Sequence, residues 1–362
     1  MSIVVIGGGV IGLSVAWQSQ RAGLSVTVID PQPASKASHV SAGMLPPGNE
    51  QLYGQPDLLK LCMTSRARIP SFFEELSEFG PTGFRRDGVL DAAFDEEALA
   101  SLGRQQEWQE PQGVRTERLT AEECAKLQPA FAPALGGLFA PDDGAVDPRV
   151  LNATLLKAVE DLGGTVVRQR AVRVENHAVT LDNGDTVPYD RLVLSAGTWT
   201  HYIEGLPEGT IPEIRPVKGQ ILRLRSDTPL LNVTARALSK GKSLYLVPRL
   251  DGELVVGATY EERGYDTEVT AGGTNELLNR AAAVLPEVGT LRLAEMSVGL
   301  RPASPDDLPL IGPTNVPDVF LSTGHFRMGV QLAPVNADGM VAYLTDGTPS
   351  DAVAPFTPLR HN

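Results

Sequence analysis

The sequence has few of the features that mark secreted, membrane-bound or nucleic-acid-binding proteins. Only two of its 362 residues are cysteines, Cys62 and Cys124. They lack the paired spacing of a zinc site or a disulfide framework, and we expect both to be inert packing residues. No apolar run reaches the roughly twenty residues that a membrane-spanning helix needs. The net charge of −13 argues against nucleic acid, whose phosphates it would repel.

Targeting and metal-binding signals are also missing. The first apolar run begins directly after Met1 and Ser2, which leaves no room for a signal peptide. We therefore expect a cytoplasmic protein that binds no metal, nucleic acid or membrane. Hydrophobic residues make up 42% of the chain and charged residues 21%, which is ordinary for a globular protein. At this length, the chain predicts about two domains with sizeable cores.

The N-terminal segment predicts a βαβ unit. An apolar, β-branched strand over 3–6 leads into a glycine-rich turn over 7–12, a helix over 13–22 and a second strand over 26–29 that ends at Asp30. The turn has the pattern G-x-G-x-x-G, which together with the flanking strands and the helix indicates dinucleotide binding.

Each glycine of this pattern has a physical reason. Gly7 allows a sharp turn, Gly9 lets the backbone approach a pyrophosphate, and Gly12 lets the helix pack close to the strand. The helix N-terminus supplies N–H groups for the phosphates. Asp30 lies where a carboxylate would hydrogen-bond ribose hydroxyls, which disfavours NADP but leaves NAD and FAD open.

The rest of the chain predicts an interrupted nucleotide domain. Leu192–Leu194 is a buried strand that ends in small residues, and Val319–Ser322 is another, followed by a glycine-bearing turn and a helix over 330–344. Both suit a central parallel sheet that returns beside the first strand. The intervening segment from Ile214 to Tyr260 is rich in strands and suggests an inserted antiparallel sheet. Lys218, within it, is expected at a turn or strand edge, with a role near the cofactor as the alternative.

Several blocks in order resemble the D-amino-acid oxidase group of FAD-dependent amine oxidoreductases, most closely its glycine oxidase (ThiO-like) branch. The blocks are Val4–Gly12 with Asp30, Ala42–Met44, Ala196–Trp199, Pro216–Gln220, Gly299–Pro302, Leu308–Gly312 and Gly324–Gly329. The resemblance runs from residue 2 to about 345. It implies an α/β fold with a discontinuous Rossmann-like FAD-binding domain (1–60, 140–212 and 295–362). An α+β substrate-binding domain built on an antiparallel sheet would be inserted (61–139 and 213–294).

The resemblance also implies the cofactor and its contacts. FAD would lie extended on the sheet, held without a covalent bond, because the sarcosine oxidase-type relatives use a cysteine late in the chain and both cysteines here come early. The residues expected to contact FAD are Gly7, Gly9, Val10, Ile11, Gly12, Asp30, Pro31, Ala37, Ser38, Ala42, Gly43, Met44, Val172, Ala196, Gly197, Trp199, His325, Phe326, Arg327, Met328, Gly329, Val330 and Gln331.

Three residues are expected by resemblance to act on the substrate. Arg301 would bind the amino-acid carboxylate through two parallel hydrogen bonds, Tyr245 would donate to the same carboxylate, and Arg327 would sit near the flavin. The implied reaction is oxidation of glycine, sarcosine or small D-amino acids by oxygen, with hydrogen peroxide as a product and a link to thiamine synthesis. His325 is expected to be structural. The enzyme would form a homo-oligomer, a tetramer or dimer.

Two pocket positions depart from the family pattern. Ser243 stands where a histidine can occur, and Tyr260 where a methionine is expected. Substrate range is therefore less defined than reaction type. A sarcosine oxidase-type enzyme, a D-amino-acid dehydrogenase that passes electrons to another acceptor, and a non-catalytic FAD-binding subunit remain alternatives.

Overall fold

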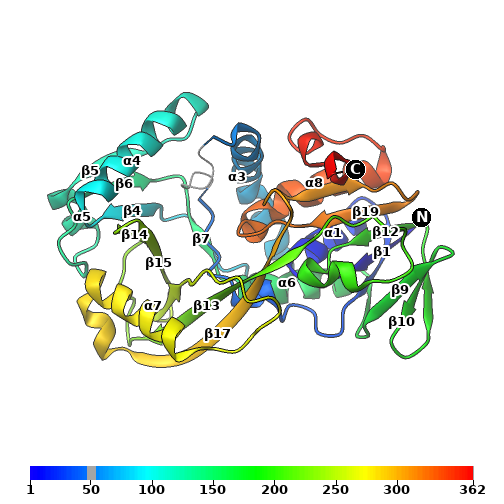
Figure 1. The fold of residues 1–362 in the computed structure, drawn as a ribbon. Helices are drawn as coiled ribbons and strands as arrows, with labels where there is room; N and C mark the ends of the chain where they lie inside the picture. Colours follow the sequence, from blue (N-terminus) through cyan, green and yellow to red (C-terminus); the bar gives the residue numbers. More distant parts are fainter. Residues whose placement is uncertain (47–53, 362) are drawn as a thin grey trace.

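Two large β-sheets form the framework of the molecule. The computed structural model describes residues 1–46 and 54–361. Figure 1 shows the larger sheet on one side and the smaller sheet, with both chain ends near it, on the other.

The smaller sheet is the Rossmann-like one. Its strands, in spatial order, are β18 (Leu310–Pro313), β19 (Val319–Thr323), β12 (Arg191–Leu194), β1 (Ser2–Ile6), β2 (Ser25–Ile29) and β8 (Thr165–Val167). All neighbouring pairs are parallel except β18 with β19. The predicted return of β12 to the side of β1 is confirmed, with Leu192 paired to Val4.

Both faces of this sheet are covered, which explains the uniformly apolar β1. Ile3 and Val5 pack in the core formed with the helices α1 (Val10–Arg21), α3 (Pro56–Leu76), α6 (Pro148–Asp161) and α8 (Gly329–Thr345). Val4 and Ile6 pack on the opposite side, against β9 (Ala171–Glu175), β10 (Ala178–Leu181) and the residues around η4 (Gly197–Tyr202). A strand buried on both faces needs apolar residues at successive positions.

The larger sheet has eight strands. In order they are β17 (Arg292–Ala303), β13 (Arg215–Arg225), β16 (Glu253–Gly257), β15 (Lys242–Pro248), β14 (Thr234–Ser239), β4 (Val89–Ala93), β6 (Gly136–Ala140) and β5 (Glu117–Thr120). Only β14 and β4 pair in parallel. Helix α7 (Ala271–Val284) packs on one face. The elements α4 (Glu96–Gln109) and α5 (Ala121–Leu127) lie near β4–β6, and β11 (Thr186–Pro188) completes the β9–β10 sheet.

The expected α/β class with an inserted antiparallel sheet is confirmed, but two local expectations are wrong. The sequence from Leu58 to Leu76 also predicts a helix that is interrupted near Pro70, but helix α3 continues through Pro70. It continues because Ile69 and Phe72 on either side are buried in the core, which offsets the loss of one backbone donor. Lys218 does not lie at a turn or sheet edge: it is in β13, between β16 and β17, and fully buried.

The predicted domain limits stay a prediction, since strand membership does not by itself define domains. Residues 61–76 lie in α3, which packs with α8 beside the six-stranded sheet. Residues 295–303 lie in β17 of the eight-stranded sheet. The predicted limits assign residues 61–76 to the substrate-binding domain, although they pack beside the six-stranded sheet. They assign residues 295–303 to the FAD-binding domain, although these residues belong to the eight-stranded sheet.

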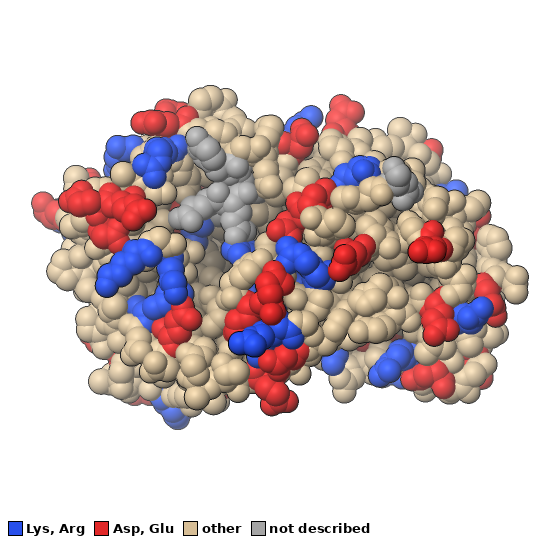
Figure 2. All heavy atoms as spheres, in the orientation of Figure 1, with Lys and Arg blue, Asp and Glu red and all other residues tan. Residues whose placement is uncertain are grey.

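The surface carries both charges. On the face shown in Figure 2, acidic and basic side chains are interspersed. Within residues 1–46 and 54–361, no helix is long and apolar enough to cross a membrane.

Candidate active site

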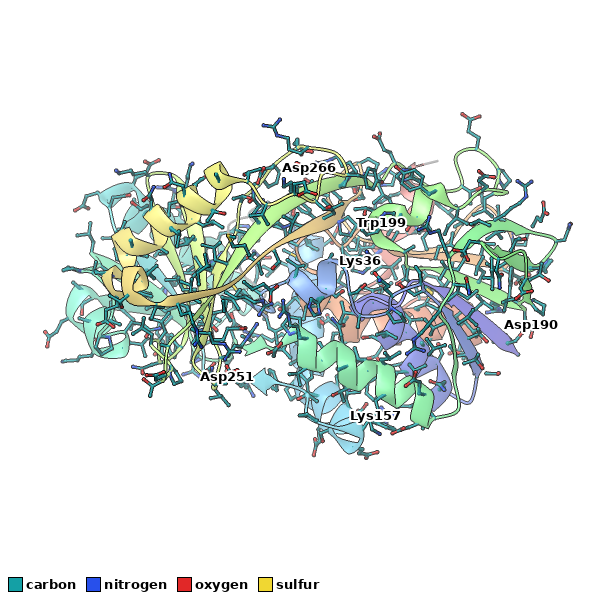
Figure 3. All side chains as sticks on the ribbon, turned by 90° about the horizontal axis from the view of Figure 1, so that it is seen from below. Lys36, Lys157, Asp190, Trp199, Asp251 and Asp266 are labelled. Carbon is teal, nitrogen blue, oxygen red and sulfur yellow. The ribbon has the colours of Figure 1, made fainter. Side chains whose placement is uncertain are left out.

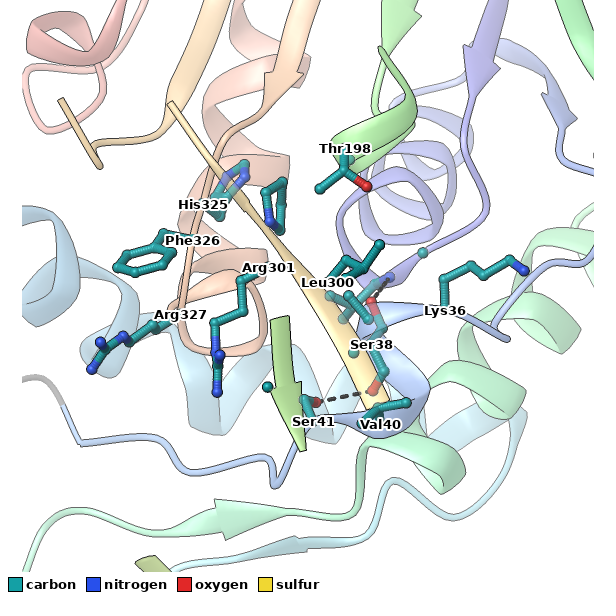
Figure 4. A pocket seen from close by; sticks show the side chains of 18 of the residues that line it. Lys36, Ser38, Val40, Ser41, Thr198, Leu300, Arg301, His325, Phe326 and Arg327 are labelled. Atoms are coloured by element: carbon teal, nitrogen blue, oxygen red, sulfur yellow. Dashed lines mark hydrogen bonds between the residues drawn. The ribbon is translucent and has the colours of Figure 1, made fainter. Parts of the chain in front are cut away.

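A cavity of about 1750 Å³ lies between the two sheets. It is bounded by the carboxyl ends of β1, β2 and β12, by α2 (Ala37–Val40), by β17 and by the turn before α8. Each site residue predicted from the sequence lines it, apart from Gly12. In Figure 4, Arg301 and Arg327 lie on one side of the cavity, and Lys36 and Ser38 lie on the other.

The turn from Gly7 to Gly12 forms a cradle at the end of β1. Gly7 has a φ of +113°, and a Cβ there would overlap the carbonyl of Ser195, the residue directly after β12. A Cβ on Gly12 would overlap the carbonyl of Gly7, so Gly12 acts by letting α1 start close to β1. The first turn of α1 presents N–H groups toward this space because they lack partners within the helix.

Polar groups around the cradle suit a dinucleotide. Asp30 accepts hydrogen bonds from Gly8 N at 2.6 Å and Gln32 N at 2.8 Å, and each oxygen retains a second lone pair for a ribose hydroxyl. The Ser195 and Thr198 hydroxyls line the cavity, are buried, and have no hydrogen-bond partner within residues 1–46 and 54–361. Buried hydroxyls normally have partners, so both suit a polar ligand. The residues present therefore fit FAD.

Two glycines make a flat floor at the other end of the cavity. Gly219 in β13 and Gly257 in β16 lie on adjacent strands. A Cβ on Gly219 would overlap the Arg301 guanidinium, and a Cβ on Gly257 would overlap the Tyr245 ring. The side chains of Arg301, from β17, and Tyr245, from β15, therefore lie across intervening strands and approach each other over the floor.

The hydrogen bonds of Arg301 hold its planar guanidinium along this glycine floor. Its Nη1 donates to the carbonyls of Lys218 and Thr259 at 3.3 Å, and its Nη2 donates to Thr259 at 3.3 Å. The Tyr245 hydroxyl is within hydrogen-bonding reach of the guanidinium. Burial raises the pKa of Tyr245, so its phenol stays protonated at neutral pH and can donate to an anion.

A second arginine, Arg327, lies on the same side of the cavity as Arg301. The Arg327 guanidinium lies 5.2 Å from the Tyr260 ring centroid and 5.0 Å from that of Phe326. Cation–π contacts of this kind hold a guanidinium in place. Burial, and then the charge of Arg301, lower the pKa of Arg327. The two like charges repel each other, and an anion bound between them would relieve that repulsion.

Three further residues predicted for the pocket, Tyr260, Ser243 and His325, are placed less directly for contact with a substrate. Tyr260 is 49% exposed, and its hydroxyl donates to Glu262 at 3.1 Å. Ser243 is exposed, lines the cavity and accepts a hydrogen bond from Arg280 at its carbonyl. His325 is buried, with Nε2 3.1 Å from Oδ1 of Asn336. Burial lowers the pKa of His325 to about 4, so it is neutral at pH 7.

Sequence reasoning missed several residues that the fold brings to the cavity. Ser195, Thr198 and Thr259 each adjoin a predicted position, so a wider window around those motifs would have included them. Lys36, whose Nζ lies 5.8 Å from the Trp199 ring centroid, has no motif to reveal it (Figure 3). The described part of the chain contains no cluster of three His, Cys, Asp or Glu residues that could hold a metal ion.

Comparisons with known proteins agree with this geometry. The model of the DAO family, described as FAD dependent oxidoreductase, matches residues 2–344. The bifunctional protein ThiO/ThiG of Synechocystis sp. is 32% identical over 99% of this chain, which spans about half (54%) of that relative's length. The glycine oxidase of Pseudomonas putida is 30% identical, with 98% of both chains covered.

A solved structure gives the same result for the whole fold. The crystal structure of glycine oxidase from Geobacillus kaustophilus superimposes with a TM-score of 0.92 at 29% identity, covering 99% of this chain and 98% of the other. The chain therefore belongs to the family of FAD-dependent oxidoreductases that its motifs predicted, and its dinucleotide cofactor is FAD.

Proposed function

We propose that this enzyme oxidatively deaminates glycine and other small primary or secondary amines, including sarcosine and small D-amino acids. The products would be an oxo acid, ammonia or an amine, and hydrogen peroxide. One observation carries the proposal: Arg301 and Tyr245 meet over a glycine floor at one end of a cavity whose other end is a dinucleotide cradle. The resemblance to enzymes named glycine oxidase supports the substrate class.

The chain offers contacts along the full length of FAD. The Gly7–Gly12 turn would hold the pyrophosphate, Asp30 the ribose, and the turn over 325–331 the flavin ring. The chemistry that bound FAD supplies is acceptance of a hydride from the substrate α-carbon at flavin N5 and reduction of oxygen to peroxide. Cys62 and Cys124 are both buried and do not line the cavity, which supports a noncovalent attachment.

Arg301 and Tyr245, here called the carboxylate clamp, would do most to orient the substrate. Arg301 would bind both carboxylate oxygens as a planar fork, and Tyr245 would donate a third hydrogen bond. With the carboxylate fixed, one Cα–H bond of the substrate would point toward the flavin. Holding reactants in such a geometry is worth several kcal/mol of the barrier, about 7–11 in well-oriented intramolecular reactions.

Among the described residues, the carboxylate that lines the cavity closest in sequence to Tyr260, that of Glu261, accepts hydrogen bonds from Gln220 and Thr259, in keeping with hydride transfer from a neutral amine rather than proton abstraction by a side chain. His325 is neutral at pH 7, and its Nε2 is directed at Asn336. Arg327 and Tyr260 would close the amine side of the pocket. Their bulk favours a small substituent on the α-carbon or the nitrogen, which the substrates named above have in common.

The setting of the reaction is also part of the proposal. The similarity to ThiO/ThiG proteins supports a role in thiamine (thiazole) synthesis, in which this chain would supply the oxidation step. A cytoplasmic location and a homo-oligomeric state remain predictions from the sequence.

A peroxide-coupled screen of the FAD-loaded enzyme tests the function. Glycine, sarcosine, D-alanine and D-proline should each yield peroxide, and L-alanine and L-proline should not. If the same amines bleach the flavin without oxygen but yield no peroxide in air, the enzyme is a dehydrogenase. If no amine bleaches the flavin anaerobically, the chain is a non-catalytic FAD-binding subunit.

A further inference from the structure

One connection between the two sheets has a role that the carboxylate clamp does not explain. The segment over 258–270, between β16 and α7, is here called the strap. It lines the cavity with Thr259, Tyr260, Glu261 and Tyr265. At its far end the Tyr265 hydroxyl donates to the carbonyl of Thr198, at 2.6 Å, in η4. The strap therefore runs from the larger sheet to the edge of the FAD cradle.

A fully buried lysine anchors the strap. The Nζ of Lys218 donates to Oδ2 of Asp266 at 2.7 Å and to the carbonyl of Glu268 at 2.6 Å. It also lies 4.0 Å from a carboxylate oxygen of Glu261. The backbones of Lys218 and Glu261 exchange two hydrogen bonds of 3.0 Å. These contacts fold the strap back onto the middle of β13.

Gln220, two residues along the same strand, holds a second part of the strap. Its backbone N–H donates to the Thr259 hydroxyl at 2.8 Å, and its side-chain amide donates to Glu261 at 2.7 Å and to Thr270 at 3.0 Å. Alternate residues of a strand point to the same side, so Lys218 and Gln220 act together on this segment. The strap is thus bound to β13 over most of its length.

The strap in turn fixes both arginines of the site. The Thr259 carbonyl accepts from both terminal nitrogens of Arg301, and the Tyr260 ring packs on the guanidinium of Arg327. We propose that Lys218 is a positioning residue, which sets the places of both arginines by holding the strap on β13. The proposal rests on the function above, since it assumes that these arginines receive a substrate carboxylate.

The energetics favour this role over simple packing. An isolated charge is costly to bury, and a lysine that only filled space would be more cheaply replaced by an apolar side chain. Here the charge has a carboxylate and a carbonyl as partners, both in the strap. The hydrogen bond from Lys218 lowers the pKa of Asp266, as expected for a pair that stays ionised.

Three substitutions test the proposal on the FAD-loaded enzyme. Lys218→Met removes the ammonium but keeps most of the length of the side chain, and Asp266→Asn removes the partner charge from a half-buried position. Lys157→Met is the control: it removes an exposed lysine that pairs with Asp161 on α6 and does not line the cavity. Figure 3 shows Lys157 well apart from Asp266. Acetate is the probe, because it has a carboxylate but no amine and binds without turnover.

The measurements are the dissociation constant of acetate, read from the absorbance of the bound flavin, the steady-state constants for glycine, and the dissociation constant of FAD. Lys218→Met should weaken acetate binding and raise KM roughly tenfold or more, since small displacements of a clamp have effects of this size. The value of kcat should fall as well, because the clamp also orients the Cα–H bond of the substrate. Asp266→Asn should shift the same constants in the same direction. The FAD constant should stay unchanged in all variants.

The outcomes separate this proposal from the function on which it rests. If Lys218→Met does not fold, Asp266→Asn decides. Acetate affinities equal to wild type in the variants that fold would overturn the positioning role, even if those variants melt at a lower temperature. A wild-type enzyme that binds neither acetate nor glycine would instead overturn the proposed function, and the positioning role with it.

Discussion

At the scale of single residues, the site depends on the shape of Arg301 as much as on its charge. The side chain lies over Gly219, and its two terminal nitrogens hold the Thr259 carbonyl while facing the cavity. A lysine would keep the charge at this position but lose the planar fork that matches a carboxylate.

Arg301→Lys should therefore weaken glycine binding with little effect on FAD. Loss of one charge-assisted hydrogen bond corresponds to about 1.5–3 kcal/mol, or roughly 10- to 100-fold in KM. Steady-state kinetics with glycine measure the change, and Arg168→Lys, at an exposed position outside the cavity, is the matched control. An unaltered KM would remove Arg301 from the clamp.

His325 gives the protein a dependence of stability on pH. Its Nε2 faces Asn336 Oδ1, which also accepts from the Ser322 hydroxyl at 3.0 Å, so His325 is the donor and is neutral. Burial lowers its pKa from 6.5 to about 4 in the folded state. Between these values the unfolded chain binds a proton that the folded chain does not. The stabilisation is therefore complete above pH 6.5 and is lost as the pH falls toward 4.

From this shift, the His325 contribution to the free energy of unfolding should be roughly 2 kcal/mol smaller at pH 5 than at pH 7. Urea unfolding of wild type and His325→Gln at both pH values measures it. The comparison must be between variants, because burial raises the pKa of Asp143 to about 7, which acts in the opposite direction. Wild type should lose more stability than the variant on acidification; equal losses would contradict the assignment.

At the scale of elements, the most specific feature of the site is the meeting of side chains from β15 and β17 across two glycine positions. Tyr245 pairs directly with Gly257 in the antiparallel register. Its ring occupies the space where a Cβ of Gly257 would stand, and this brings the hydroxyl toward Arg301. The floor therefore needs glycine for its lack of a side chain.

Gly257→Ala should displace the Tyr245 ring and lose its hydrogen bond to the substrate, raising KM for glycine by about tenfold, the effect of one hydrogen bond. Gly272→Ala is the control, because an added Cβ there meets no atom within 4 Å. Steady-state kinetics and flavin content measure the effect. A variant with normal KM and normal flavin content would show that Tyr245 does not contact the substrate.

How far the sequence predicts these elements depends on whether the signal is local. The βαβ unit and the strands β12 and β19 were predictable, because apolar periodicity and glycine turns lie within each segment. The place of Lys218 was not. Its burial results from the strap, whose Asp266 lies 48 residues later, and no local pattern reports such a contact.

The candidate site shows the same difference between local patterns and contacts between distant parts of the sequence. The motifs indicate which residues belong to it, and nearly all of them line the cavity. They do not indicate that Arg301 and Tyr245 approach each other over Gly219 and Gly257, since that depends on the register of four strands.

At the scale of the whole molecule, the cavity lies between the two sheets, so a bound cofactor should stabilise the entire chain. Direct links between the sheets also exist: Arg149 in α6 donates to both carboxylate oxygens of Glu295 in β17, at 2.9 and 2.6 Å. The buried Arg249, directly after β15 of the larger sheet, donates to the carbonyls of Val146 and Ala42. These contacts couple the stability of one side to that of the other.

Removal of FAD should therefore lower the melting temperature of the whole protein, and added FAD should restore it in a concentration-dependent way. A ligand at 100 times its Kd adds about 2.7 kcal/mol to the free energy of unfolding, provided that it binds only the folded state. Gly9→Val should remove this response, because its side chain would enter the cradle beside Ser38. Gly289→Ala, where a Cβ meets no atom within 4 Å, should keep it.

Calorimetry of the apoprotein across a series of FAD concentrations measures the shift. One transition that moves as a unit would show that the two sheets unfold together, whereas two transitions, of which only one responds to FAD, would show that the contacts of Arg149 and Arg249 do not couple them.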